Sequence, residues 1–233
     1  MSPEKREEFY RRLAKAMPNP QSELEHGTPY ELLVAVVLSA QATDKGVNIA
    51  TRKLFPAANT PAAIVALGVP GLEEYIKTIG LYHGKAKNVV ALSQILLDKH
   101  GGEVPRTREA LEALPGVGRK TANVVLNVAF GESTLAVDTH VYRVANRTGL
   151  APGKDPLEVE EKLLKATPPK YLRNAHHYLI LHGRYTCLAK KPLCGQCVVF
   201  EQCGFREKKK FAAEASTAAS TKPKAKLPKG RDV

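Results

Sequence analysis

The chain has 233 residues, 43% of them hydrophobic, so it can bury one large core or two smaller ones. Its formal net charge of +12 at pH 7 favours a polyanionic partner. The longest apolar run, residues 32–40, falls short of the ~20 residues that span a bilayer, and residues 1–13 lack the apolar stretch of a signal peptide. We therefore expect a soluble cytoplasmic protein, free or associated with the nucleoid.

Helix starts recur along the chain. Thr28-Pro29, Thr60-Pro61 and Asp155-Pro156 each place a capping side chain before a proline, which at the first helical position gives up only an amide that had no partner. Apolar residues then recur at helical spacing in residues 32–37 and 157–164. Alternating β-branched runs are scarce. The sequence predicts an all-α protein of about ten helices.

The stretch 111–126, LEALPGVGRKTANVVL, predicts two short helices joined by a tight turn. A phosphate-binding P-loop is excluded because Arg119 separates the last glycine from the lysine, and a dinucleotide fingerprint lacks its third glycine. An ordinary turn remains possible. Against it, the unpaired amides at the start of the second helix, after Gly116, Val117 and Gly118, form a site for one phosphate. We expect a positive φ at Gly116 and Gly118.

Lys120 lies in the first turn of that second helix, where the helix dipole disfavours a cation. One interpretation is a further phosphate contact. The other is an amine of lowered pKa that attacks carbon and needs a nearby carboxylate. Asp138 is the candidate carboxylate, and we expect it also to cap a helix.

Cys187, Cys194, Cys197 and Cys203 are all the cysteines of the chain, in a C-x6-C-x2-C-x5-C pattern. Disulfides are unfavourable in a protein without an export signal. Four thiolates suit zinc or a [4Fe–4S] cluster, and the spacing leaves both open. Beyond them, residues 207–233 are rich in Lys, Ala, Ser and Pro and predict a disordered basic tail, either a solubilising segment or a weak tether to nucleic acid.

The stretches LPGVGRKTANVV and VDTHVYRVANR together resemble the endonuclease III family of helix-hairpin-helix DNA glycosylases. The resemblance extends over about residues 5–206 and implies that Lys120 is the nucleophile, that Asp138 is its partner and that the four cysteines hold a [4Fe–4S] cluster. It implies two helical subdomains with the active site in the cleft between them. A six-helix barrel would comprise residues 22–132, with the hairpin at 107–126. The second subdomain would comprise 1–21 and 133–206, with the cluster loop at 187–203.

The same resemblance implies further DNA contacts. Gln41 and Leu81 would fill the gap left by a flipped nucleotide, although a polar loop residue and a core leucine are the ordinary alternatives. Lys190 and Lys191 would face DNA phosphates from the loop between the first two cysteines. His140 is expected to contact DNA, with a core histidine as the alternative.

The implied function is base-excision repair. A monomer would act on double-stranded DNA that contains damaged bases or abasic sites, remove oxidised pyrimidines and cut the strand by β-elimination through a lysine Schiff base. The alternatives are a glycosylase for mismatched or alkylated bases and a non-catalytic helix-hairpin-helix DNA-binding protein.

Overall fold

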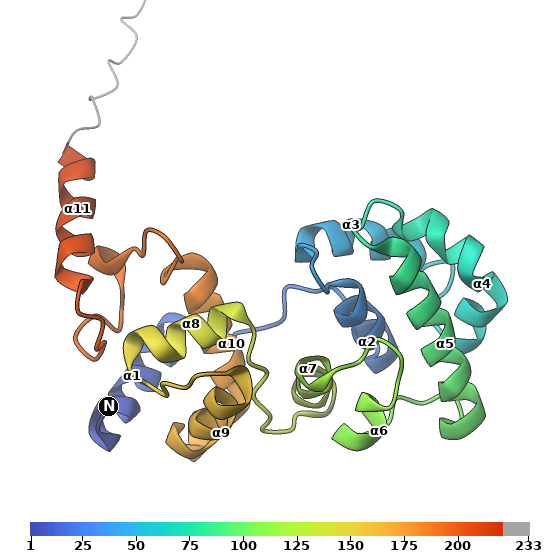
Figure 1. Ribbon diagram of the computed structural model, residues 1–233, viewed down its shortest axis with the longest axis horizontal. Helices are drawn as coiled ribbons and strands as arrows, with labels where there is room; N and C mark the ends of the chain where they lie inside the picture. The colour runs from blue at the N-terminus through green and yellow to red at the C-terminus, as the bar shows by residue number, and fades with distance from the viewer. Residues whose placement is uncertain (221–233) are drawn as a thin grey trace, which may run out of the picture.

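The computed structural model describes residues 1–220 and confirms the all-α prediction: this part of the chain contains helices and no strand (Figure 1). The α-helices are α1 Pro3–Ala16, α2 Pro29–Leu38, α3 Asp44–Leu54, α4 Pro61–Ile76, α5 Tyr82–His100, α6 Arg108–Glu112, α7 Arg119–Phe130, α8 Thr139–Thr148, α9 Pro156–Ala166, α10 Pro169–Tyr185 and α11 Lys208–Ser220. A 3-10 turn covers Cys194–Gln196. No helix within residues 1–220 is long and apolar enough to cross a membrane.

The predicted helix caps are present. The side chains of Thr28, Thr60 and Asp155 accept hydrogen bonds from the backbone N–H groups three residues on, at 3.1, 3.2 and 2.9 Å. A proline follows each of them at the first helical position. These contacts form within four consecutive residues, which is why local sequence predicts them.

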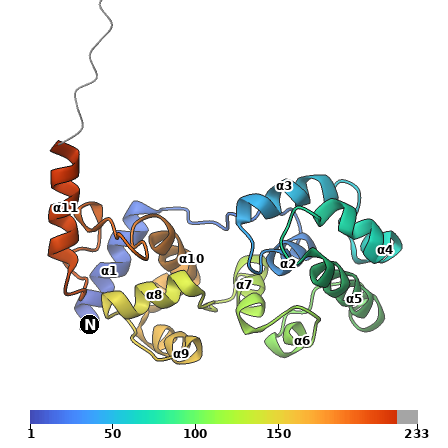
Figure 2. The same ribbon diagram turned by 45° about the horizontal axis from the view of Figure 1, so that its top comes forward.

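Buried side chains form two separate cores. The first core draws on the helices from α2 to α7 and on residues between Leu24 and Ala136. The second core draws on α1, on α8 to α10 and on the cysteine segment as far as Val199. Figures 1 and 2 show the two groups of helices side by side, with the chain passing between them through residues 17–28 and again through residues 131–138.

The second core joins α1 to segments far along the chain. The Tyr10 ring is completely buried, and its hydroxyl shares a hydrogen bond with Thr167 Oγ1 at 2.8 Å. Burial raises the pKa of the Tyr10 hydroxyl. Helix α1 therefore packs with segments that lie more than a hundred residues further along the chain.

The predicted disorder from residue 207 is wrong for residues 208–220, which form α11. Alanine, lysine and glutamate favour helix, and composition alone cannot distinguish such a helix from a solvated coil. The start of α11 is also anchored. Lys208 Nζ donates to the carbonyls of Phe200 and Cys203 at 2.6 and 2.7 Å, and the Phe211 ring stacks on Phe205. The rest of the predicted tail, residues 221–233, lies outside the described residues.

Candidate active site

The turn between α6 and α7 has two glycines with different roles. Gly116 has φ 79°, as predicted, and a Cβ there would lie 3.0 Å from Nδ2 of Asn88. The prediction of positive φ is wrong for Gly118, whose φ is −101°. Instead, no heavy atom lies within 4 Å of the position that a Gly118 Cβ would occupy. Gly118 thus leaves open space at the start of α7.

That open space faces backbone donors. The first amides of any α-helix have no intrahelical acceptor, and no side chain caps those of α7. The Val117 side chain is buried in the first core, and its N–H bonds to the Leu114 carbonyl at 3.1 Å. The free amides and the positive end of the helix dipole can therefore bind an anionic ligand at this turn.

Lys120 is exposed in the first turn of α7, whereas its neighbour Arg119 reaches across to the second core. Arg119 donates to both carboxylate oxygens of Glu160 on α9, at 3.0 and 2.8 Å. The Glu160 side chain is only 4% exposed. Its hydrogen bond raises the pKa of Arg119. This pair fixes the helix that carries Lys120 against the other group of helices.

Asp138 is the N-cap of α8, as predicted. Its Oδ1 accepts the Val141 N–H at 2.7 Å, which holds the carboxylate in one orientation at the edge of the second core. No ion pair joins Asp138 to Lys120 in the part of the chain that the structure describes.

The structure nevertheless brings several predicted residues around one cavity of about 790 Å³. Lys120 lines it from α7, and Asp138 and His140 line it from the start of α8. Gln41 lines it from the loop between α2 and α3. The amine and the carboxylate therefore come from opposite sides of the space between the two cores, where a substrate group can reach both.

Gln41 and Leu81 share an unusual backbone conformation. Among residues 1–220 they are the two non-glycine residues with positive φ, at 55° and 61°. Such strain costs about 1–3 kcal/mol and clusters at functional sites. Leu81 is 66% exposed, so it is not a core leucine. Unlike Gln41, Leu81 does not line the large cavity.

The remaining predicted contacts lie further along the second group of helices. Lys190 and Lys191 are exposed in the loop between the first two cysteines. His140 is half-buried, and its Nδ1 lies 3.2 Å from Nη2 of Arg143. Its place on the cavity wall distinguishes it from a core histidine.

His176 was not singled out from the sequence. It is buried on α10, and its Nδ1 lies 2.9 Å from the Ala136 carbonyl oxygen. Burial, and then the neighbouring His177, lower its pKa to about 4, while Asp138 opposes that shift and Lys120 adds to it. His176 also lines a narrow cavity of about 50 Å³ that Lys120 shares. It is therefore a neutral polar group beside the amine and the carboxylate.

Asp44 and Arg184 are further wall residues that sequence reasoning missed. Both line the large cavity, and Arg184 Nη1 donates to Asp44 Oδ2 at 2.5 Å. Asp44 begins α3 after its cap Thr43, so its sequence context indicates only a first-turn acid. Arg184 lies at the end of α10, three residues before the first cysteine.

The four thiols are free. Burial, with a smaller contribution from the charges of the other three cysteines, raises the pKa of Cys197 to about 12. Arg147 contributes a positive charge beside them: its Nη1 lies 3.6 Å from Cys187 Sγ, and it donates to the carbonyls of Leu188 and Ala189 at 2.6 and 2.8 Å. Within residues 1–220, no three His, Cys, Asp or Glu side chains are grouped closely enough to hold a single metal ion. Buried thiols that are costly to ionise alone suit a positively charged iron centre.

Comparison with protein families supports both parts of this arrangement. The HhH-GPD superfamily of base excision DNA repair proteins matches residues 34–169, more than half of the chain. The iron–sulfur binding domain of endonuclease III matches residues 187–203, which contain every cysteine. The predicted [4Fe–4S] cofactor is thereby confirmed, and the zinc alternative is set aside.

Relatives and solved structures give the same result. Endonuclease III of Haemophilus influenzae is 60% identical over 91% of this chain and 100% of its own length, and that of Escherichia coli K12 is 60% identical over 89% and 99%. A trapped endonuclease III–DNA covalent intermediate superposes with a TM-score of 0.83 at 46% identity, over 90% of this chain and 98% of the other. A thermostable thymine-DNA glycosylase gives 0.79 at 26% identity, over 88% and 98%. The chain therefore belongs to the endonuclease III family of base-excision repair enzymes, DNA glycosylases with AP lyase activity.

Proposed function

We propose that Lys120 is the nucleophile and Asp138 its carboxylate partner. The observation that carries this assignment is that both side chains line one cavity, from elements of the two different cores. We take the two cores to represent two subdomains, divided as the sequence predicts at residues 22–132 and at 1–21 with 133–206. The cavity between them is the proposed active site, and Cys187, Cys194, Cys197 and Cys203 are the proposed cluster ligands.

The proposed reaction begins with the Lys120 amine in its neutral form. Its lone pair attacks C1′ of the damaged nucleotide, a nitrogen–carbon bond forms, and the glycosidic bond breaks with its electrons leaving on the base. The Asp138 carboxylate stabilises the positive charge that develops on the sugar and takes up a proton from the amine. The α8 cap keeps that carboxylate in place through Val141.

The second stage cuts the strand. The C1′–O4′ bond of the adduct then breaks with its electrons leaving on O4′, which takes up a proton, and the nitrogen–C1′ bond becomes the double bond of a Schiff base. The Schiff base acidifies the proton on C2′. Loss of that proton expels the 3′ phosphate oxygen with the electrons of the C3′–O bond, and the strand breaks on the 3′ side of the lesion. Water then hydrolyses the Schiff base and returns the free amine. His176, neutral because burial lowers its pKa to about 4, can orient water beside Lys120 without repelling it.

The proposed DNA contacts are of two kinds: contacts to backbone phosphates and contacts that fill the duplex where a nucleotide has flipped out. The turn of Gly116, Val117 and Gly118 is proposed to bind phosphate without reading sequence, through the amides other than the Val117 N–H, which bonds to the Leu114 carbonyl. Lys190, Lys191 and His140 are proposed to add contacts on the second group of helices. Gln41 and Leu81 would occupy the duplex around a flipped nucleotide, and their strained backbones support this role.

We propose that double-stranded DNA with oxidised pyrimidines or abasic sites is the substrate and that the enzyme acts as a monomer in the cytoplasm, at the nucleoid. The relatives at 60% identity are all endonuclease III. Removal of mismatched bases is the second candidate, favoured by the structural match to a thymine-DNA glycosylase. A panel of duplexes carrying single oxidised, mismatched or alkylated bases separates the two.

The test of the nucleophile is borohydride trapping of the Schiff base. Lys120→Gln is expected to bind damaged duplex and to give no trapped adduct. Lys154 lines the same cavity, so Lys154→Gln is the matched control and is expected to trap like the parent. Parental trapping by Lys120→Gln would show that another amine attacks the sugar.

A further inference from the structure

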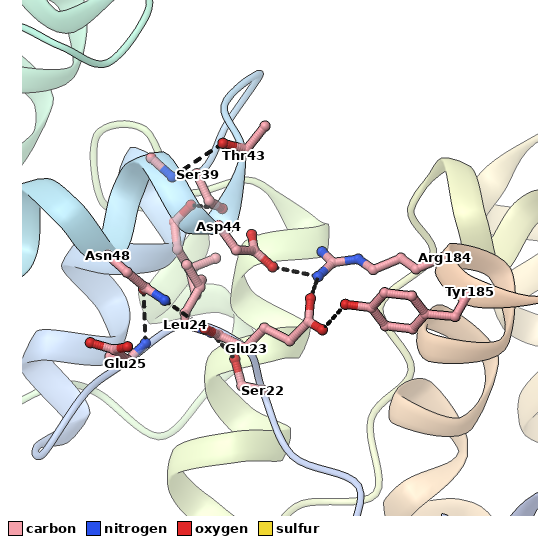
Figure 3. A network of polar contacts seen from close by, with 12 residues as sticks. Ser22, Glu23, Leu24, Glu25, Ser39, Thr43, Asp44, Asn48, Arg184 and Tyr185 are labelled. Atoms are coloured by element: carbon pink, nitrogen blue, oxygen red, sulfur yellow. Dashed lines mark hydrogen bonds and ion pairs between the residues drawn. The ribbon is translucent and has the colours of Figure 1, made fainter. Parts of the chain in front are cut away.

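The segment that joins α1 to α2 is fixed to α3 by its backbone (Figure 3). Asn48 on α3 donates from Nδ2 to the Glu23 carbonyl at 2.8 Å, and its Oδ1 accepts the Glu25 N–H at 3.0 Å. Because α3 packs in the first core, these two bonds make residues 23–25 part of that side of the molecule.

The Glu23 side chain points the other way, to the end of α10. Its two carboxylate oxygens accept hydrogen bonds from Arg184 Nη1 and from the Tyr185 hydroxyl (Figure 3). The hydrogen bond to Glu23 raises the pKa of Tyr185, in keeping with a protonated phenol that donates. The Arg184 side chain is 24% exposed and that of Glu23 34%. Partial burial and charge assistance make such contacts stronger than an exposed surface ion pair.

Of the residues in these contacts, Arg184 lines the cavity that contains the proposed site. Arg184 also bonds to Asp44, and both residues line the space that contains Lys120 and Asp138. Tyr185, by contrast, lies outside that lining. Arg184 is therefore bonded to two carboxylates, Asp44 inside the cavity lining and Glu23 outside it.

On the other side of the cavity, α7 has its own ties to the second group of helices. Arg119 pairs with Glu160, and Asn127 Nδ2 donates to the Arg173 carbonyl at 2.9 Å. Loss of the Glu23 contacts would leave those ties intact. The wall that carries Gln41 would then be joined to α10 through the Asp44–Arg184 pair.

We propose that Glu23 is a positioning residue that clamps α10 to α3 and so sets the width of the cavity between the two cores. The inference rests on the proposed function, because the cavity matters for the reaction only as the active site. Reacting atoms must approach to about 3–3.5 Å, and a misplacement of about 1 Å can cost 10²-fold in rate. A residue that touches no substrate can therefore control the chemical step through Arg184.

The experiment compares two linker carboxylates in the cluster-containing full chain. Glu23→Gln removes the charge and one of the two acceptors. Glu25→Gln is the matched control, because Glu25 pairs with Arg52 on α3 and its contact stays on one side of the cavity. Three quantities are measured: the single-turnover rate of borohydride-trapped adduct at saturating damaged duplex, the Kd for undamaged duplex, and amide hydrogen exchange in residues 39–46.

We expect Glu23→Gln to lower the trapping rate at saturation by about tenfold or more. Hydrogen exchange in residues 39–46 should speed up by about tenfold, the equivalent of one charge-assisted hydrogen bond. The Kd for undamaged duplex should stay within about twofold, since the hydrogen bonds of the Glu23 side chain go to Arg184 and Tyr185 and not to the hairpin. Glu25→Gln should match the parent in all three measurements.

Two results would overturn the proposal: parental trapping and exchange in Glu23→Gln, or an equal loss in Glu25→Gln. If Glu23→Gln does not fold, Tyr185→Phe removes a single hydrogen bond of the clamp, and unchanged trapping and exchange in that variant would overturn it instead. Trapping by Lys120→Gln would refute the proposed nucleophile separately, because the exchange comparison does not depend on which amine reacts.

Discussion

Alanine at Gly116 should mainly lower stability, whereas alanine at Gly118 should mainly weaken DNA binding. At Gly116, with φ 79°, a side chain is forced into the left-handed region and its Cβ would meet Asn88 at 3.0–3.1 Å. The left-handed conformation costs about 1–2 kcal/mol, and the contact brings the total to about 2–3 kcal/mol. For a chain of this size that lowers Tm by about 4–12 °C.

Gly118→Ala meets no steric barrier, because φ is −101° and the space around the new Cβ is open. The expected stability loss is about 0.5–1 kcal/mol, the difference between glycine and alanine as an N-cap. The methyl group would instead occupy the approach to the free amides of α7. Losing one phosphate contact should weaken duplex binding by about tenfold, for damaged and undamaged DNA alike.

Calorimetric melting and fluorescence anisotropy at fixed salt test this pair of variants. Gly116→Ala should show the larger fall in Tm, and Gly118→Ala should show weakened binding with a nearly parental Tm. Parental affinity of Gly118→Ala for undamaged duplex would refute the phosphate-binding role of the hairpin. Loss of lesion binding alone would place the hairpin in the base pocket.

Three further predictions follow from the site. Asp138→Asn keeps a good helix cap, so affinity and Tm should stay near parental while turnover falls by about 10²-fold; an equal fall in affinity would contradict a catalytic role. Purified protein should contain about four iron and four acid-labile sulfide per chain, and elemental analysis showing one zinc without iron would exclude the cluster. The pKa of His176 is about 4 in the folded chain against 6.5 for the free group, so the unfolded chain binds the extra proton and stability should fall as pH drops from 6.5 towards 4. Melting curves of His176→Asn should show a shallower loss over that interval, and an unchanged slope would exclude His176 as its source.

Short sequence patterns predicted the features that depend on a few consecutive residues. The caps at Thr28, Thr60 and Asp155 and the cap at Asp138 each depend on a few consecutive residues, and all four form as predicted. The left-handed conformation of Gly116 was also predicted, whereas that of Gly118 was not found. Two glycines in one turn can serve different needs, backbone conformation in one case and open space in the other, and sequence does not distinguish them.

The contacts across the cavity could not be read from the sequence. Arg184 is separated from Asp44 by 140 residues and from Glu23 by 161. Each of these residues has a common local explanation as a first-turn acid, a linker carboxylate or a cation near a helix end. Only the packing of the two cores brings them together. Helix α11 was missed for a different reason, since its residues suit both a helix and a coil until Phe211 and Lys208 find partners.

The discontinuous second core has a consequence for the order of events during synthesis. The first core uses residues 24–136 and can form while later residues are still being added. Helix α1 emerges first, yet its Tyr10 must wait for Thr167, 157 residues later, before its hydroxyl is paired. Closing so long a loop is slow, and the cysteine segment that completes this core is made later still. We therefore expect nascent chains halted when residue 136 has left the ribosome and Thr167 has not to resist protease over residues 24–136 and to lose α1. Protection of α1 should arrive only once the cysteine segment has left the ribosome.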